Sequence, residues 1–151
     1  MSPNLKAFLD AIAWSEIGPK LLASSDNGYN VLVGGNLFHT YADHPRVLVW
    51  IPRLNINSTA AGRYQLLARY FDAYKVRLKL SDFSPASQDA IAVQQITERR
   101  ALPLIESGDF AAAVDRVSNI WASLPGAGYG QHEHTMAELE SAYAAAGGAM
   151  A

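Results

Sequence analysis

The N-terminal segment carries apolar residues at the spacing of an α-helix. Ser2 and Pro3 are typical of an N-cap and a first helical residue. The apolar positions that follow are Leu5, Phe8, Leu9, Ile12 and Ala13. The Gly18-Pro19 pair predicts the end of this helix. Glu16 falls four residues after Ile12 and so continues the apolar stripe, which is an unusual place for a carboxyl group.

From residue 29 to residue 56 the helical spacing disappears. Short runs of β-branched and aromatic residues are interrupted by Gly34-Gly35, His44-Pro45 and Pro52, which predicts a small, irregular β region. Helical spacing returns after Thr59 and continues to about Leu78. The apolar positions of this predicted helix are Tyr64, Leu67, Tyr70, Phe71 and Tyr74.

The second half of the chain contains three further helix-start signals. They are Ser84-Pro85 ahead of Ile91 to Ile96, Asp109 ahead of Phe110, Val114, Val117 and Trp121, and the Thr135 and Glu138 capping box of a last helix through Tyr143. A glycine-rich loop is expected from Pro125 to Gly130, and a frayed tail from Gly147. The pattern predicts a mainly helical α+β fold without repeats or linkers.

Composition and charge narrow the possible classes of protein. At 151 residues, half of them hydrophobic, the chain suits one domain over residues 1–151. No apolar run is long enough to span a bilayer, and no signal peptide is recognisable at the N-terminus. A net charge of -2 argues against nucleic-acid binding. Without cysteine there is no disulfide framework, and the redox compartment stays open.

Glu16 is the best candidate for acid/base chemistry. An apolar setting next to Trp14 would disfavour the charged carboxylate and leave a proton available near neutral pH. The alternative is an ordinary glutamate that points to water at a frayed helix end. His132 and His134 flank Glu133 but lack the spacing of a zinc site, so no metal is expected. His44 is interpreted as a loop residue that holds local backbone.

Several contiguous motifs resemble the bacteriophage lambda endolysin family. They are Ala13-Trp14-Ser15-Glu16, Asn27-Gly28-Tyr29, Val33-Gly34-Gly35, Asp43-His44-Pro45-Arg46, Ser58-Thr59, Gly62-Arg63-Tyr64-Gln65-Leu66-Leu67, Asp82-Phe83-Ser84-Pro85 and Ser118 to Gln131. The resemblance runs from about Lys6 to Gly148. It implies a lysozyme-like fold, with a substrate cleft between two lobes, as a single catalytic domain.

The resemblance also implies an activity. Members of that family are lytic transglycosylases that cleave the MurNAc-GlcNAc β-1,4 bond of peptidoglycan and leave 1,6-anhydro-muramyl ends. Glu16 would protonate the glycosidic oxygen and, as the carboxylate, then accept the proton of the attacking muramyl 6-hydroxyl. No metal or cofactor is needed for this reaction.

By the same resemblance, Ser58, Tyr64 and Gln65 are expected to hydrogen-bond the sugar chain, and Tyr129 and Gln131 to line a glycine-rich binding wall. The alternatives are a core role for Tyr64 and a plain helix connector for the loop. Asp26 is interpreted as a turn residue, which favours transglycosylation over an inverting hydrolase. The chain departs from the family at Ile17, Leu21 to Ser25 and Ala60, which leaves the cleft shape and the substrate range open.

Two other functions stay open at the level of sequence. One is a hydrolytic muramidase that uses water as the nucleophile. The other is a non-catalytic glycan-binding or virion structural protein that has kept the fold, because function belongs to a site and not to a fold. For the leading hypothesis we expect a monomer that collects in the host cytoplasm. A separate holin would open the inner membrane and let it reach the periplasmic cell wall.

Overall fold

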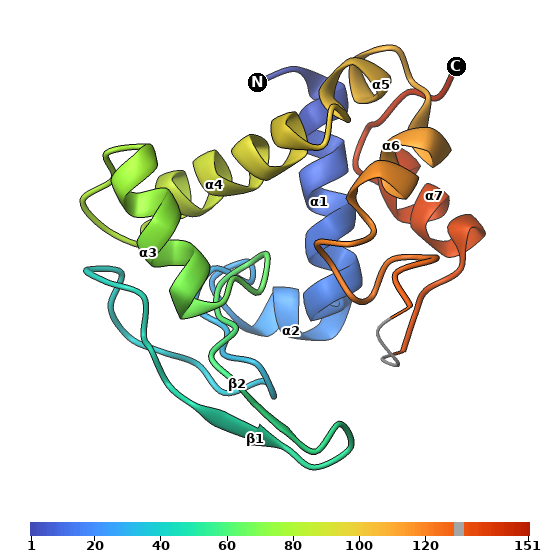
Figure 1. Ribbon diagram of the computed structural model, residues 1–151. Helices are drawn as coiled ribbons and strands as arrows, with labels where there is room; N and C mark the ends of the chain where they lie inside the picture. Colours follow the sequence, from blue (N-terminus) through green and yellow to red (C-terminus); the bar gives the residue numbers. More distant parts are fainter. Residues whose placement is uncertain (129–131) are drawn as a thin grey trace. The chain divides into compact units, whose positions relative to one another are not determined.

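The first helix forms as the sequence predicts. α1 spans Pro3–Ile17, and the Ser2 hydroxyl accepts a hydrogen bond of 3.1 Å from the backbone N–H of Leu5. This bond satisfies one of the donors that the first turn of a helix leaves without a partner. The computed structural model describes residues 1–128 and 132–151, and Figure 1 shows its ribbon.

The remaining elements follow α1 along the chain. They are α2 (Pro19–Ser24), β1 (Val49–Ile51), β2 (Ile56–Ser58), α3 (Ala68–Arg77), α4 (Pro85–Glu98), α5 (Leu102–Glu106), α6 (Phe110–Val117) and α7 (Met136–Ala145). Helices joined to one small antiparallel sheet confirm the predicted α+β, mainly helical class. No helix in the described part of the chain is long and apolar enough to cross a membrane.

The backbone packs as two compact units. The terminal unit consists of Met1–Glu16 and Ala92–Ala151, and the central unit consists of Ile17–Ile91. The boundaries between the units fall inside α1 and α4. Each unit therefore contains one part of each of these helices.

Aromatic rings in edge-to-face and stacked contacts lie in the core of the terminal unit. The ring of Phe110 on α6 lies 5.7 Å from that of Phe8 on α1 and 4.3 Å from that of Tyr143 on α7. All three side chains are buried, and pairs of rings at these distances stabilise a core beyond their buried area. The predicted Thr135 and Glu138 capping box starts α7 and is confirmed. Trp121, predicted to continue the stripe of α6, is buried but lies beyond the end of that helix.

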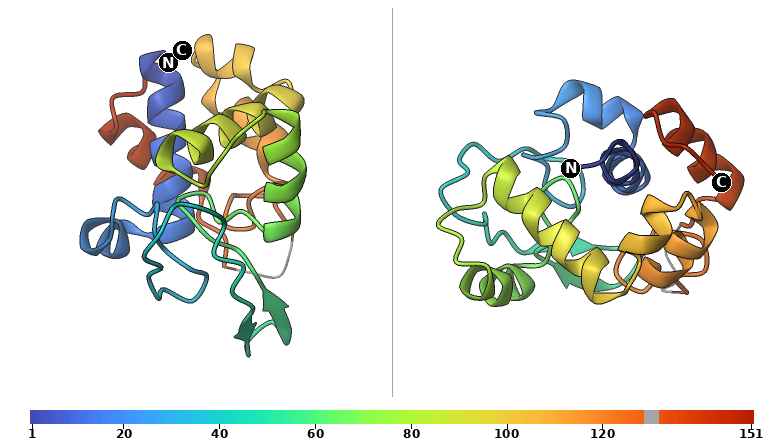
Figure 2. Two further views of the ribbon diagram at one scale, coloured as in Figure 1. Left: turned by 90° about the vertical axis from the view of Figure 1, so that its left-hand side faces the viewer. Right: turned by 90° about the horizontal axis from the view of Figure 1, so that it is seen from above.

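The C-terminal tail is tied down, so the prediction of a frayed end was wrong. The backbone N–H of Ala149 donates to the Asn4 side chain at 2.9 Å, and the N–H of Ala151 donates to the carbonyl of Gly108 at 3.0 Å. The Tyr143 hydroxyl also donates to the carbonyl of Ala149. Both ends of the chain consequently lie at the same end of α1, as the views of Figure 2 show. Local patterns do not predict the bonds to Asn4 and Gly108, because these partners lie in distant segments of the chain.

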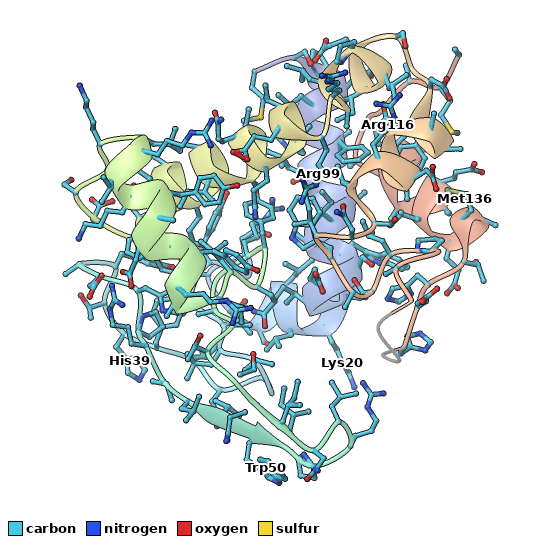
Figure 3. The ribbon with its side chains drawn as sticks, in the orientation of Figure 1. Lys20, His39, Trp50, Arg99, Arg116 and Met136 are labelled. Atoms are coloured by element: carbon cyan, nitrogen blue, oxygen red, sulfur yellow. The ribbon has the colours of Figure 1, made fainter. Side chains whose placement is uncertain are left out.

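The central unit combines a short hairpin with an aromatic core. β1 and β2 pair antiparallel, with Trp50 opposite Asn57. Trp50, labelled in Figure 3, is 51% exposed. The buried core behind the hairpin consists of Leu32, Phe38, Ala61, Leu66, Phe71, Phe83 and Ile91. The predicted β region is present, although its two strands occupy only the end of the predicted segment and extend to Ser58.

The start of α3 differs from the prediction, and two short helices were not predicted. α3 begins at Ala68, not directly after Thr59, because the intervening residues form tight turns. Gly62 has a φ of +83°, and a Cβ there would lie 2.3 Å from Oε1 of Gln88, so only glycine fits. α2 and α5 were not predicted, since each is a helix of five or six residues whose proline stands within the first two positions.

Candidate functional site

Glu16 lies in the last turn of α1, as the apolar stripe predicts. The preceding residues Ala11, Ile12 and Ala13 are buried, and Glu16 itself is half-buried. Burial raises the pKa of Glu16 from 4.5 to about 7, and a hydrogen bond from Ser123 opposes this rise. At neutral pH the protonated and ionised forms are therefore both populated. This is the condition for a group that both donates and accepts a proton.

Two serine hydroxyls link Glu16 to the segment that follows α6. Ser123 Oγ donates to Glu16 Oε2 at 3.1 Å, and Ser15 Oγ lies 2.8 Å from Ser123 Oγ. Both serines are buried. This pair was not predicted from the sequence, because residues 15 and 123 are far apart in the chain and serine pairs have no recognisable spacing.

Trp14 and His134 form the neighbouring aromatic contact. Their ring centroids lie 4.6 Å apart, and the His134 backbone N–H donates to the Ser123 carbonyl at 2.9 Å. His134 Nδ1 lies 3.8 Å from Glu138 Oε2. Ser123 is therefore held both through its backbone and through its hydroxyl. This fixes the group that donates to Glu16.

The glycine-rich loop is anchored by a glutamate. The carboxylate of Glu133 accepts hydrogen bonds from the backbone N–H groups of Gly126 at 3.0 Å and Gly128 at 2.9 Å. Both bonds lower the pKa of Glu133, and the bond from Gly128 contributes more. This role of Glu133 was not predicted from the sequence, in which Glu133 stands out only as the residue between His132 and His134. The predicted binding residues Tyr129 and Gln131 lie outside the described residues.

The predicted sugar-binding residues of the central unit all hold local structure. Ser58 Oγ accepts the Ala60 N–H at 3.1 Å. The Gln65 amide donates to the carbonyls of Gly62 at 2.9 Å and Val31 at 3.2 Å, and Gln65 adopts a left-handed backbone with φ of 50°. These bonds position the turn that leads into α3. Ser58 and Gln65 remain partly exposed.

Tyr64 is a buried aromatic, 5% exposed, and it precedes α3. Its hydroxyl donates to Asp89 at 2.6 Å and accepts from Arg63 at 3.0 Å. Tyr29 donates to the same carboxylate at 2.9 Å, and the Arg63 guanidinium lies 5.4 Å from the Tyr29 ring centroid. This environment fits the alternative of a core role for Tyr64. Asp89 was missed because nothing in its local sequence marks it.

Asp26 lies in an exposed turn, as predicted. Its carbonyl accepts the Tyr29 N–H at 2.9 Å, its own N–H donates to the Asn30 side chain at 2.8 Å, and its carboxylate accepts the Tyr41 hydroxyl. The prediction of a turn residue is confirmed.

His44 holds local backbone, also as predicted. Nε2 lies 2.8 Å from the Leu66 carbonyl and Nδ1 accepts the Arg46 N–H at 3.0 Å, which identifies a neutral ring protonated at Nε2. Among the described residues no three His, Cys, Asp or Glu side chains form a metal-binding group. His132 and His134 meet only ring edge to ring face, 5.1 Å apart.

Comparison with known proteins gives consistent matches over the whole chain. The endolysin family model matches residues 6–150. The endolysin of Escherichia phage lambda is 59% identical over 145 residues, covering 95% of this chain and 90% of the phage protein. The endolysin of Escherichia phage P2 is 44% identical over 154 aligned positions, with coverage of 96% and 93%.

Two solved structures of bacteriophage lambda lysozyme are similar to this chain. One, in complex with a chitohexasaccharide, has a TM-score of 0.95 and 54% sequence identity, and the other has a TM-score of 0.90 and 53% identity. Each match covers 100% of this chain and 98% of the lambda lysozyme chain. The resemblance seen in the sequence motifs is thereby confirmed. The chain belongs to the endolysin family, the bacteriophage proteins that degrade the peptidoglycan of their hosts.

Proposed function

We propose that this endolysin is a lytic transglycosylase that cleaves the MurNAc-GlcNAc β-1,4 bond of peptidoglycan and leaves 1,6-anhydro-muramyl ends. The observation that carries the proposal is the environment of Glu16. Its side chain is half-buried, burial raises its pKa to about 7, and its carboxyl accepts a hydrogen bond from the neutral Ser123 hydroxyl. A chitohexasaccharide bound to the similar lambda lysozyme supports a glycan substrate.

Glu16 acts twice in the proposed reaction. The protonated carboxyl first gives its proton to the glycosidic oxygen while the bond from that oxygen to C1 breaks. The muramyl 6-hydroxyl then attacks C1, and the Glu16 carboxylate takes up the proton that this hydroxyl loses. The carboxyl returns to its starting state and no water is consumed.

A hydrolytic muramidase is the second candidate. Hydrolases of glycosides usually use two carboxyl groups, of which one activates water or forms a covalent intermediate. The nearest acidic residue after Glu16 in the sequence is Asp26, whose carboxylate already accepts the Tyr41 hydroxyl in an exposed turn. This engagement favours the mechanism in which Glu16 needs no second carboxylate.

The whole chain is proposed to work as one catalytic domain, because the family model extends over both units. We propose Ser58, Gln65, Tyr129 and Gln131 as sugar contacts, with Tyr64 acting through the turn it shares with Gln65. The protein would act as a monomer and reach the periplasmic wall through a membrane opened by a holin. Expression in Escherichia coli should then cause lysis only when a holin is expressed with it.

The test of the reaction is mass spectrometry of the soluble products of purified peptidoglycan. Wild-type protein should release fragments with anhydro-muramyl ends, and Glu16→Gln should release none. Reducing muramyl ends would identify a hydrolase. Binding of glycan without products from either protein would favour the non-catalytic alternative.

A further inference from the structure

The Ser15 and Ser123 hydroxyls form a short chain that ends on the Glu16 carboxyl. Ser15 Oγ lies 2.8 Å from Ser123 Oγ, with either atom able to donate, and Ser123 Oγ lies 3.1 Å from Glu16 Oε2. Ser15 Oγ also lies 3.4 Å from the Ser123 carbonyl. The two serine side chains are 6% and 9% exposed, so water has little access to these groups.

One direction of the chain suits the ionised carboxyl. The Ser15 hydroxyl donates to Ser123 Oγ, and the Ser123 hydroxyl donates to the Glu16 carboxylate. Each hydroxyl can donate one hydrogen bond and accept up to two. A hydrogen bond to an ionised oxygen is the stronger kind, so this direction stabilises the carboxylate.

The opposite direction suits the protonated carboxyl. Glu16 then donates to Ser123 Oγ, Ser123 donates to Ser15 Oγ, and Ser15 donates to the Ser123 carbonyl. That carbonyl already accepts the His134 N–H at 2.9 Å, but a carbonyl oxygen has two lone pairs. Every hydroxyl in this buried chain thus has an acceptor in either direction.

We propose that Ser15 and Ser123 are positioning residues whose hydrogen bonds reverse direction when Glu16 changes its protonation state. The proposal rests on the proposed function, in which one carboxyl is first the acid and then the base. The serines gain and lose no proton, because their O–H bonds only rotate. Glu16 gives one proton to the glycosidic oxygen and takes one from the muramyl 6-hydroxyl.

The groups around the two serine hydroxyls do not set the direction of their hydrogen bonds. Among the described residues no charged side chain contributes to the raised pKa of Glu16, which burial causes and the Ser123 bond opposes. The titratable residue that described contacts join to the chain is His134, through its backbone N–H. Its ring packs against Trp14 and its Nδ1 lies near Glu138. The state of Glu16 therefore decides which way the hydroxyls point.

The two serines should change the pKa of Glu16 in opposite directions. Ser123→Ala removes the donor to the carboxylate, so the pKa should rise by about one unit. In Ser15→Ala the Ser123 hydroxyl lacks an acceptor, but only when Glu16 is protonated. The substitution therefore destabilises the protonated form, and the pKa of Glu16 should fall by less than about one unit. Ser118→Ala is the matched control, because Ser118 is as buried as Ser123 but donates to the Asp115 carbonyl.

Two measurements follow these shifts. The first is a ¹³C NMR titration of the Glu16 carboxyl in each variant, assigned by comparison with Glu16→Gln, which needs no substrate. The second is the alkaline limb of the pH profile of kcat/KM, which reports the pKa of a general acid in the free enzyme. Both should move up in Ser123→Ala, down in Ser15→Ala, and stay in place in Ser118→Ala.

Shifts of the same sign in the two variants, or no shift in either, would overturn the proposal. If Ser123→Ala does not fold, Ser123→Cys keeps a weak donor and should give a smaller upward shift, and a downward shift or none would count against the chain. Opposite NMR shifts together with reducing product ends would keep the hydroxyl chain and reject the transglycosylase. The two failures are therefore distinguishable.

Discussion

Asp89 in the central unit and Glu16 in the terminal unit both accept hydroxyl groups, and the two carboxyls accept different numbers of hydrogen bonds. In the central unit, Asp89 accepts hydrogen bonds from Tyr29 at 2.9 and 3.2 Å and from Tyr64 at 2.6 Å. In the terminal unit, Glu16 accepts the hydroxyl of Ser123 at 3.1 Å. The chemical groups are alike, but the number of donors differs.

The difference separates a carboxyl that anchors the fold from the carboxyl that we propose as the acid and base. The donors on Asp89 join α4 to two turns of the central unit, and they come from tyrosines that stay protonated. Burial, together with the charge of Asp89, raises the pKa of Tyr29 to about 12. Glu16 is buried with less compensation, so it retains a proton near neutral pH. Asp89 thus stabilises the fold, and Glu16 has the protonation behaviour that the proposed reaction requires.

The largest effect should come from removing the carboxyl of Glu16, the proposed acid and base. Glu16→Gln cannot transfer a proton, so cleavage of peptidoglycan should fall by about 100- to 10,000-fold. The rate is measured by dye release from labelled peptidoglycan. Glu106→Gln is the control, since Glu106 also accepts a serine hydroxyl, from Ser2 at 2.6 Å, but is exposed. Equal losses in the two variants would contradict the assignment.

Removing the anchor should affect stability more than chemistry. Asp89→Ala leaves two tyrosine hydroxyls without their acceptor, so the free energy of unfolding should fall by about 2 to 4 kcal/mol in urea denaturation. Asp43→Ala removes an exposed ion pair with Arg46 in the same unit and should cost less than about 1 kcal/mol. A loss at Asp89 no larger than that at Asp43 would mean that the network is not an anchor.

Glu16 should also reduce stability at alkaline pH. A carboxyl whose pKa is raised from 4.5 to about 7 stabilises the fold fully below 4.5, and this contribution is lost as the pH rises through 7. Glu16→Gln should therefore raise the free energy of unfolding by about 1 to 3 kcal/mol at pH 8, relative to its effect at pH 4. Urea denaturation at the two pH values measures the difference. A constant effect would show that the carboxyl is solvated.

His44 should make the stability of the fold depend on pH less strongly than Glu16 does, and in the opposite direction. Burial lowers the pKa of this ring below 6.5, because its neutral form packs against Phe71 and Phe83 and accepts the Arg46 N–H. Its contribution is fully present above 6.5 and is lost as the pH falls through the lowered pKa. Thermal melts of His44→Gln should show a weaker loss of stability below pH 6.5 than wild type. His39→Gln, at an exposed position, should behave as wild type.

Local signals predicted much of the fold. The Ser2 cap, the apolar stripe of α1 and the capping box of α7 depend on neighbours within four residues, and each was readable from the sequence. The late start of α3 was not, because it depends on Gly62 packing against Gln88. The ordered tail depends on Asn4, at the opposite end of the chain.

The candidate site also has parts that the sequence predicted and parts that it did not. The position of Glu16 followed from helical periodicity, and its role followed from motif resemblance. Its partner Ser123 was not predictable, because their hydrogen bond joins residues separated by 107 positions. The sequence also did not indicate that Asp89 accepts hydrogen bonds from the hydroxyls of Tyr29 and Tyr64. Charge and spacing alone do not show how many hydrogen bonds a carboxyl accepts.

The most direct measurement is digestion of purified peptidoglycan in water enriched in ¹⁸O, followed by mass spectrometry of the muramyl ends. If Glu16 acts alone and the muramyl 6-hydroxyl is the nucleophile, the new ends are anhydro sugars that carry no ¹⁸O. Reducing muramyl ends in place of the anhydro ends would show that water attacks C1. That result would contradict the account of a single carboxyl acting as both acid and base.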